Sequence, residues 1–314
     1  MKTSLTTFED DLRLCLLDTV YGQWSRLGVP YVQSLSTHSR EIIDPEALVW
    51  FSLEFCPREP RLAEGLVEWV LEFDQYLIRQ RINKLADKND PRFVIWSILD
   101  TQRRPRSNRP TQNADEPQVS EDLRAYCEWF TRWIDDRDHT NKRVGRPVHD
   151  ATTVLLQARD VLGSDIRHFI LIYLLTHHGR GKLKTISQWS TYSYRSVSET
   201  ATRWESADIV TIDHGTCTLT QTDAWHALLQ HHIRDAVWVD WPSVFSSCIE
   251  LLRALRKADG KSLTLDSPVL RKYCRAVIDA TSSLGGDRPE DAAPSIREIR
   301  DVVLAAAPSA LDHR

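Results

Sequence analysis

Apolar residues recur at the spacing of an α-helix along most of the first hundred residues. Between residues 8 and 27 they fall three and four positions apart, as on the buried face of a helix, and Gly28 and Pro30 end this run. An acid followed by proline is typical of a helix start, because the acid can cap free N–H groups and proline suits the first helical position. Three such pairs occur, at Asp44-Pro45, Glu59-Pro60 and Asp90-Pro91. Asp74 is expected to cap a further helix that runs to Leu85, so residues 1–100 are predicted to form a helical N-terminal domain.

Most of the remaining chain is predicted to consist of helices joined by polar segments. Residues 101–118 contain four Arg, three Pro and no large apolar residue, which is typical of a solvated linker, with a phosphate-contacting arm as the alternative. We expect connecting helices over 119–162, C-terminal helices over 223–284, and a linker with a terminal helix over 285–314. Gly145-Arg146-Pro147 resembles part of the AT-hook core, but Val144 stands where that motif has its first Arg, so a basic loop is the preferred interpretation.

Residues 163–222 show a different succession of patterns. Ser164 is expected to cap a helix, which Gly179 and Gly181 then end. A short second helix is predicted over 184–190, followed by a four-residue turn, and Ser193 is a suitable N-cap for a third helix. Residues 209–212 and 218–220 are then typical of two short strands, and Asp213-His214-Gly215-Thr216 is a tight hairpin signal between them.

The third of these helices is predicted to bury one face. Val197, Ala201 and Trp204 fall at positions i, i+4 and i+7, which share one side of a helix. They are expected to pack against apolar residues of the two preceding helices, namely Phe169, Ile170 and Ile186. The opposite side then carries short or polar side chains that can approach a nucleic acid.

These motifs resemble a known family. The segment Ser193-x-Arg195-Ser196-Val197-Ser198, followed by Trp204-Glu205-x-x-Asp208-Ile209-Val210, is similar to the recognition helix of MarR-like and ArsR-like winged-helix regulators. Those proteins typically show Ser-x-x-Thr-Val-Ser and then Leu-Glu-x-x-Gly-Leu-Ile or Gly-Ile-Val, so Trp204 replaces Leu here and Asp208 replaces Gly. The resemblance is confined to residues 163–222 and implies a winged helix-turn-helix with a small β-hairpin wing there. With the helical patterns before and after it, the whole chain is predicted to be mainly α, with a helical N-terminal bundle and C-terminal helices on either side of this central unit.

The resemblance implies double-stranded DNA as the partner. The start of a recognition helix usually enters the major groove, where Arg195 can bind guanine O6 and N7, whereas Lys182 and Lys184 are expected to contact phosphates. Glu199 could accept from a cytosine amine, but a solvated residue that repels phosphates is the preferred interpretation. The predicted DNA-binding residues are Lys182, Lys184, Thr185, Tyr194, Arg195, Ser196, Ser198, Thr202, Arg203 and His214.

Charge leaves a second interpretation open. The whole chain carries a net charge of −4, and residues 163–220 contain six Lys and Arg against five Asp and Glu, a net charge of only +1. DNA binding depends strongly on neutralising phosphates, so this surplus is small. The alternative is a protein-interaction or antitoxin-like module whose winged helix and acidic N-terminal bundle bind a protein partner. A homodimer is expected for a regulator that reads two half-sites.

No pattern in the sequence predicts catalysis or a cofactor. The six cysteines lie far apart, and neighbouring histidines such as His177 and His178 would point about 100° apart on a helix, so neither arrangement predicts a metal site. We therefore expect a non-enzymatic protein without cofactors. The acidic N-terminal residues and the lack of a long apolar stretch favour a cytoplasmic protein that does not enter membranes.

Overall fold

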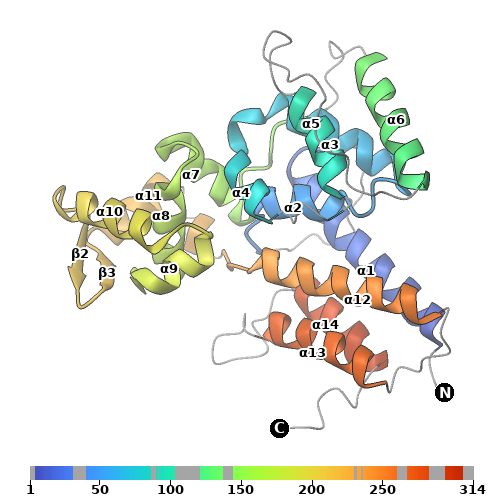
Figure 1. The fold of residues 1–314 in the computed structure, drawn as a ribbon. Helices are drawn as coiled ribbons and strands as arrows, with labels where there is room; N and C mark the ends of the chain where they lie inside the picture. Colours follow the sequence, from blue (N-terminus) through green and yellow to red (C-terminus); the bar gives the residue numbers. More distant parts are fainter. Residues whose placement is uncertain are drawn as a thin grey trace.

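The computed structural model describes residues 4–30, 40–85, 90, 92–102, 121–136, 144–229, 232–234, 236–259, 267–282 and 294–306. Within these ranges the chain is mainly helical, with fourteen α-helices and one three-stranded antiparallel sheet (Figure 1). Among the same residues, no helix combines the length and the hydrophobicity that crossing a membrane requires. The predicted linker 101–118 lies outside the described residues beyond Gln102, as do residues 285–293.

Six helices occupy the N-terminal part of the chain: α1 (Leu5–Arg26), α2 (Pro45–Ser52), α3 (Pro60–Glu72), α4 (Arg79–Leu85), α5 (Arg92–Gln102) and α6 (Glu121–Asp136). The predicted starts of α2, α3 and α5 at acid–proline pairs are confirmed. Asp44 caps α2 by accepting from the Ala47 N–H, whereas Glu59 makes no capping bond and pairs with Arg13 instead. The cap predicted at Asp74 is wrong, because Asp74 begins a single 3-10 turn and α4 starts only at Arg79.

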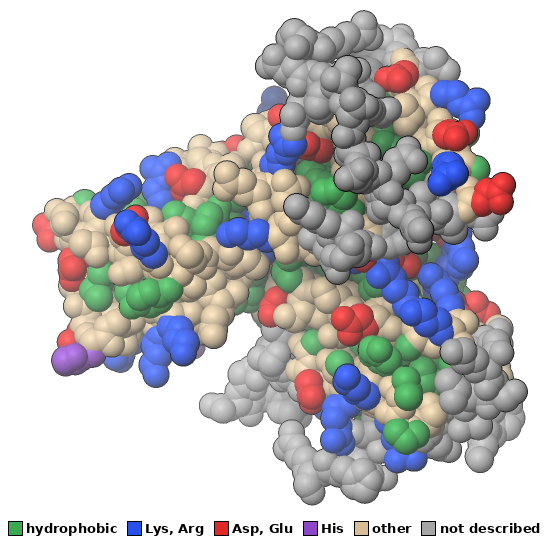
Figure 2. All heavy atoms as spheres, in the orientation of Figure 1, with side chains coloured by type: hydrophobic (Ala, Val, Ile, Leu, Met, Phe, Trp, Pro, Cys, Tyr) green, Lys and Arg blue, Asp and Glu red, His purple; other side chains and the backbone are tan. Residues whose placement is uncertain are grey.

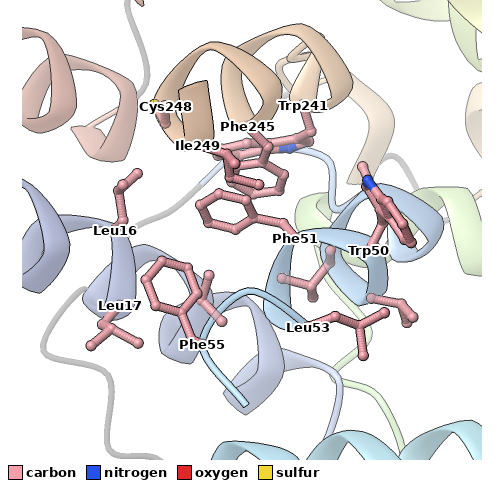
Figure 3. Close-up of a cluster of buried hydrophobic side chains, with 14 of the residues drawn as sticks. Leu16, Leu17, Trp50, Phe51, Leu53, Phe55, Trp241, Phe245, Cys248 and Ile249 are labelled. Carbon is pink, nitrogen blue, oxygen red and sulfur yellow. The ribbon is translucent and has the colours of Figure 1, made fainter. Parts of the chain in front are cut away.

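The C-terminal helices complete the core of these N-terminal helices. They are α12 (Trp241–Asp259), α13 (Pro268–Ser282) and α14 (Pro294–Ala306), and α12 and α14 both pack against α1 (Figure 1). In this core the ring of Phe51 from α2 stacks on Phe245 from α12, with centroids 3.9 Å apart (Figure 3). We call α1–α6 together with α12–α14 the helical body.

Together with Ile42 and with buried residues near 154–158 and 229–238, a second hydrophobic core is built from the elements α8 (Ile166–Thr176), β1 (Arg180–Lys182), α9 (Leu183–Ser190), α10 (Tyr194–Glu205), β2 (Val210–Asp213) and β3 (Thr216–Leu219). We call these elements the α8–β3 unit. Its sheet has the order β1-β3-β2, and both pairings are antiparallel. The predicted packing is confirmed, since the α10 residues Val197, Ala201 and Trp204 are buried in one cluster with Phe169, Ile170 and Ile186. The predicted cap at Ser164 is wrong: Asp165 caps α8, and the Ser164 hydroxyl donates to the Gln75 carbonyl over 2.6 Å.

Buried ion pairs lie between the helical body and the helix that precedes the α8–β3 unit. Glu46 from α2 receives both Nη groups of Arg159, at 2.8 and 2.9 Å, and an Nη group of Arg81 at 2.9 Å, while Arg81 also binds Asp44. These four side chains are almost wholly buried, and their formal charges cancel. Burial alone would raise the pKa of Asp44, but the neighbouring Arg81 more than offsets this and holds that pKa below its usual value. Arg159 belongs to α7 (Val154–Leu162), so this buried charge network fixes α2, α4 and α7 to one another.

The network ends at a neutral histidine on α8. His168 is fully buried, and its Nε2 accepts from Arg159 Nε over 3.1 Å. Its Nδ1 lies 3.1 Å from the Gly163 carbonyl oxygen, so Nδ1 carries the proton and donates. Burial, followed by the positive charge of Arg159, lowers the pKa of His168 well below 6.5. The α8–β3 unit is therefore attached to the helical body through buried ion pairs and hydrogen bonds.

The segment from Val144 to Val148 is docked on the helical body. The Gly145 N–H donates to the Gly28 carbonyl over 2.8 Å, and the Val148 N–H donates to the Arg26 carbonyl over 2.8 Å. Gly28 has φ +90, and a Cβ at this residue would stand 2.3 Å from the Gly145 carbonyl oxygen. Backbone contacts therefore hold this segment against the end of α1, which favours the basic-loop interpretation over an AT-hook.

Candidate nucleic-acid interface

Local signals fix where α10 begins and which side it exposes. Thr191 adopts a left-handed conformation, with φ 63, at the end of α9, and the Ser193 hydroxyl then accepts from the Ser196 N–H over 3.1 Å as the cap of α10. Because Val197, Ala201 and Trp204 face the core, the other side of α10 is left to solvent. Six of the predicted DNA contacts lie on α10. Two of them, Ser196 and Ser198, are half-buried, and the other four are exposed: Tyr194, Arg195, Thr202 and Arg203.

Arg195 is held by its own helix. Its Nε donates to Glu199 Oε1 over 2.7 Å, one turn further along α10, and the two side chains are 87% and 52% exposed. The hydrogen bond raises the pKa of Arg195 and lowers the pKa of Glu199. Among the described residues the two Nη groups of Arg195 make no hydrogen bond, so they remain available for a bidentate contact. Glu199 thus orients Arg195 as well as adding a negative charge.

The link from α10 to the hairpin requires a left-handed residue. Asp208 has φ 56, and the Thr220 hydroxyl donates to its carbonyl over 2.7 Å. Glycine adopts this conformation at little cost, and Asp is among the few other residues that tolerate it. Glu205 Oε1 also accepts from the Ile212 N–H over 2.9 Å and so ties the end of α10 to β2.

The hairpin tip has the geometry that its sequence predicts. His214 and Gly215 have φ values of 46 and +75, as the two central residues of a type I′ turn require. The His214 side chain is 96% exposed, with Nε2 3.6 Å from Asp213 Oδ1. The Leu183 N–H donates to the Gly215 carbonyl over 2.9 Å, so the first residue of α9 is bonded to this tip. The predicted contacts Lys182, Lys184 and Thr185, all exposed, therefore lie next to the hairpin.

The sequence did not predict the strand β1, which places the exposed Arg180 on the sheet. Opposite residues of an antiparallel sheet share a face, and the pairing sets Arg180 beside Thr218 and Lys182 beside Thr216 on the outer face. Gly181 faces inward, where a Cβ would stand 2.3 Å from the Tyr173 ring, so only glycine lets β1 lie against α8. The only signal for β1 in the sequence was this glycine between the two basic residues Arg180 and Lys182.

On the face of the α8–β3 unit that Figure 2 shows, Lys and Arg side chains do not form one continuous patch. In Figure 2 they stand apart from one another, with acidic and uncharged surface between them. On α10 itself, Arg195 and Arg203 are balanced by Glu199 and Glu205. The surface can therefore make individual contacts with phosphates or bases but supplies little overall attraction.

Comparison with protein-family models, with curated proteins and with solved structures finds no match. An assignment of function consequently depends on the geometry of this chain.

Other chemistry finds little support in the ranges that the structure covers. No group of three or more His, Cys, Asp or Glu side chains is arranged there to bind a metal ion. The thiols are mostly buried, and burial raises the pKa of Cys217 to about 11, which keeps it protonated at neutral pH. The predicted contacts on α10, at the start of α9 and at the hairpin tip are exposed or half-buried.

Proposed function

We propose that this chain is a DNA-binding regulator that uses residues 163–222 as a winged helix-turn-helix. The carrying observation is the element order of the α8–β3 unit together with the sheet order β1-β3-β2. In this assignment α9 and α10 are the helix-turn-helix, and the β2–β3 hairpin is the wing. The capped start of α10, with its exposed polar side, supports its role as the recognition helix.

Contacts to DNA follow from the exposed groups. The start of α10 enters the major groove, where the two free Nη groups of Arg195 bind guanine O6 and N7. Lys182 and Lys184 bind phosphates beside the wing and contribute affinity without sequence preference. Two copies of the chain bind together as a homodimer, because regulators of this kind read two half-sites.

The test compares Arg195→Ala with Lys184→Ala. A target is first selected from a pool of random duplexes with the parent chain, and all variants are then titrated against that target and a random duplex at several salt concentrations. Arg195→Ala should cost about 1–3 kcal/mol on the target and reduce the preference for it. Lys184→Ala should weaken both duplexes alike and lower the salt slope by about one.

Arg58→Ala is the matched control, since Arg58 is exposed on the helical body away from the α8–β3 unit, and it should leave both titrations unchanged. Tight, unchanged binding of the target by Arg195→Ala would remove α10 from its proposed role.

A protein partner is the second candidate, as in an antitoxin-like module. The observation that favours a protein partner is the charge balance on α10, which carries two arginines and two glutamates. A parent chain with no affinity for any duplex at low salt, together with a stable complex with a protein of defined composition, would give this candidate the lead.

A further inference from the structure

Three basic residues lie on α4, and their partners differ. Arg79 pairs with Asp100 at 2.5 Å, and Arg81 binds Asp44 and Glu46. Lys84 has no carboxylate partner among the described residues. Its ammonium instead donates to the Thr191 carbonyl over 3.0 Å and lies 5.4 Å from the centre of the Tyr192 ring. Thr191 and Tyr192 form the turn between α9 and α10, so a cation from the helical body stands at the turn of the proposed helix-turn-helix.

The position of Lys84 is fixed by its neighbours on α4. Arg81, one turn earlier, lies with its guanidinium carbon 4.8 Å from the centre of the Phe169 ring on α8 and is part of the buried charge network. Asn83 accepts from Trp96 Nε1 over 3.1 Å, which ties α4 to α5. These contacts fix α4, and with it the backbone of Lys84, beside the turn between α9 and α10.

The chemistry of Lys84 fits an anion. An ammonium has three N–H donors, of which the Thr191 carbonyl takes one, and the exposed side chain leaves the others to solvent. Thr191 precedes the cap residue Ser193 by two positions, so this charge lies near the end of α10 that enters the groove in the proposed function. Phosphates flank that groove on both sides.

We propose that Lys84 is a phosphate contact, so that the DNA-binding surface extends from the α8–β3 unit onto α4 of the helical body. This inference rests on the proposed function. It adds a positive charge to a segment whose own surplus is only +1 over residues 163–220. It also gives the helical body a direct part in binding.

The test measures the affinity for a random duplex against salt concentration for Lys84→Gln, Lys84→Arg and the parent. Each phosphate contact adds about 0.9 to the slope of log affinity against log salt, so Lys84→Gln should lower that slope by about one. A fourfold rise in salt should then weaken the parent about three- to fourfold more than this variant. Lys84→Arg keeps the charge and should keep the slope. Lys257→Gln removes an exposed lysine from α12 and is the matched control, with no expected change.

The outcomes separate this inference from the function on which it rests. If the parent binds no duplex at any salt concentration, the proposed function fails and this inference fails with it. If the parent binds and Lys84→Gln has the parental slope, only the phosphate contact is overturned. Equal losses of affinity in Lys84→Gln and Lys84→Arg, with the slope retained, would also overturn it and would make Lys84 a positioning residue for the turn.

Discussion

Replacing Glu46 with Gln tests whether the buried charge network holds the molecule together. The carboxylate of Glu46 accepts four hydrogen bonds, two from Arg159, one from Arg81 and one from the Ile78 N–H over 2.8 Å. Gln keeps the shape but removes the negative charge, which leaves two guanidinium groups facing only Asp44. Breaking a buried pair by removing one partner costs about 3–5 kcal/mol, so Glu46→Gln should lower the free energy of unfolding by that amount.

The matched control is Glu59→Gln. Glu59 also pairs with an arginine, Arg13, at 2.6 Å, but these side chains are 24% and 25% exposed, and pairs near the surface contribute only about 0–1 kcal/mol. Urea unfolding followed by tryptophan fluorescence measures both variants. At a slope near 3 kcal/mol/M, Glu46→Gln should lower the midpoint by about 1–2 M and the control by much less. Equal shifts in the two variants would refute the reasoning that burial sets the magnitude.

Three further predictions concern stability. Trp204→Ala should cost about 3–5 kcal/mol in the same unfolding assay, because Trp204 is only 7% exposed in the second core, and a loss below 1 kcal/mol would contradict this packing. Gly28→Ala should cost more than Gly215→Ala: both glycines have positive φ, worth about 1–3 kcal/mol, but only the Cβ at Gly28 meets backbone atoms. Stability should fall as the pH drops through about 6.5, because the pKa of His168 is lowered in the folded chain, so that only the unfolded chain binds a proton there. His168→Gln should flatten this pH dependence, and a urea midpoint that rises on acidification would exclude the explanation.

Local signals were enough to predict most helices. Asp44 and Pro45 determine the start of α2, since Asp44 accepts from the N–H group three residues further along the chain. Ser193 determines the start of α10 in the same way. The turn between β2 and β3 was predictable because His214 and Gly215 can adopt positive φ. These elements depend on groups that are close to one another in the chain, and so they can be predicted from the sequence alone.

Features that depend on distant partners were not predictable in this way. The strand β1 has three residues and no alternation of apolar positions, and it exists because its backbone pairs with β3. The periodic face of α12 indicates burial but does not say that α1 and α2 cover it. Lys84 was missed as a candidate contact because the carbonyl it binds, at Thr191, lies 107 positions away.

The core shared by the first and last helices has a consequence for synthesis on the ribosome. Phe51 stacks on Phe245, and Val303 of α14 is buried in the same cluster, so the helical body lacks part of its core until the last of these residues has emerged. The elements of the α8–β3 unit are all synthesised before α12. At about 5–20 residues per second, the N-terminal helices wait on the order of ten to fifty seconds for their partners. The parts of α1 and α2 that α12 and α14 cover in the finished fold lack that cover during the interval, which is when the chain is most prone to aggregate.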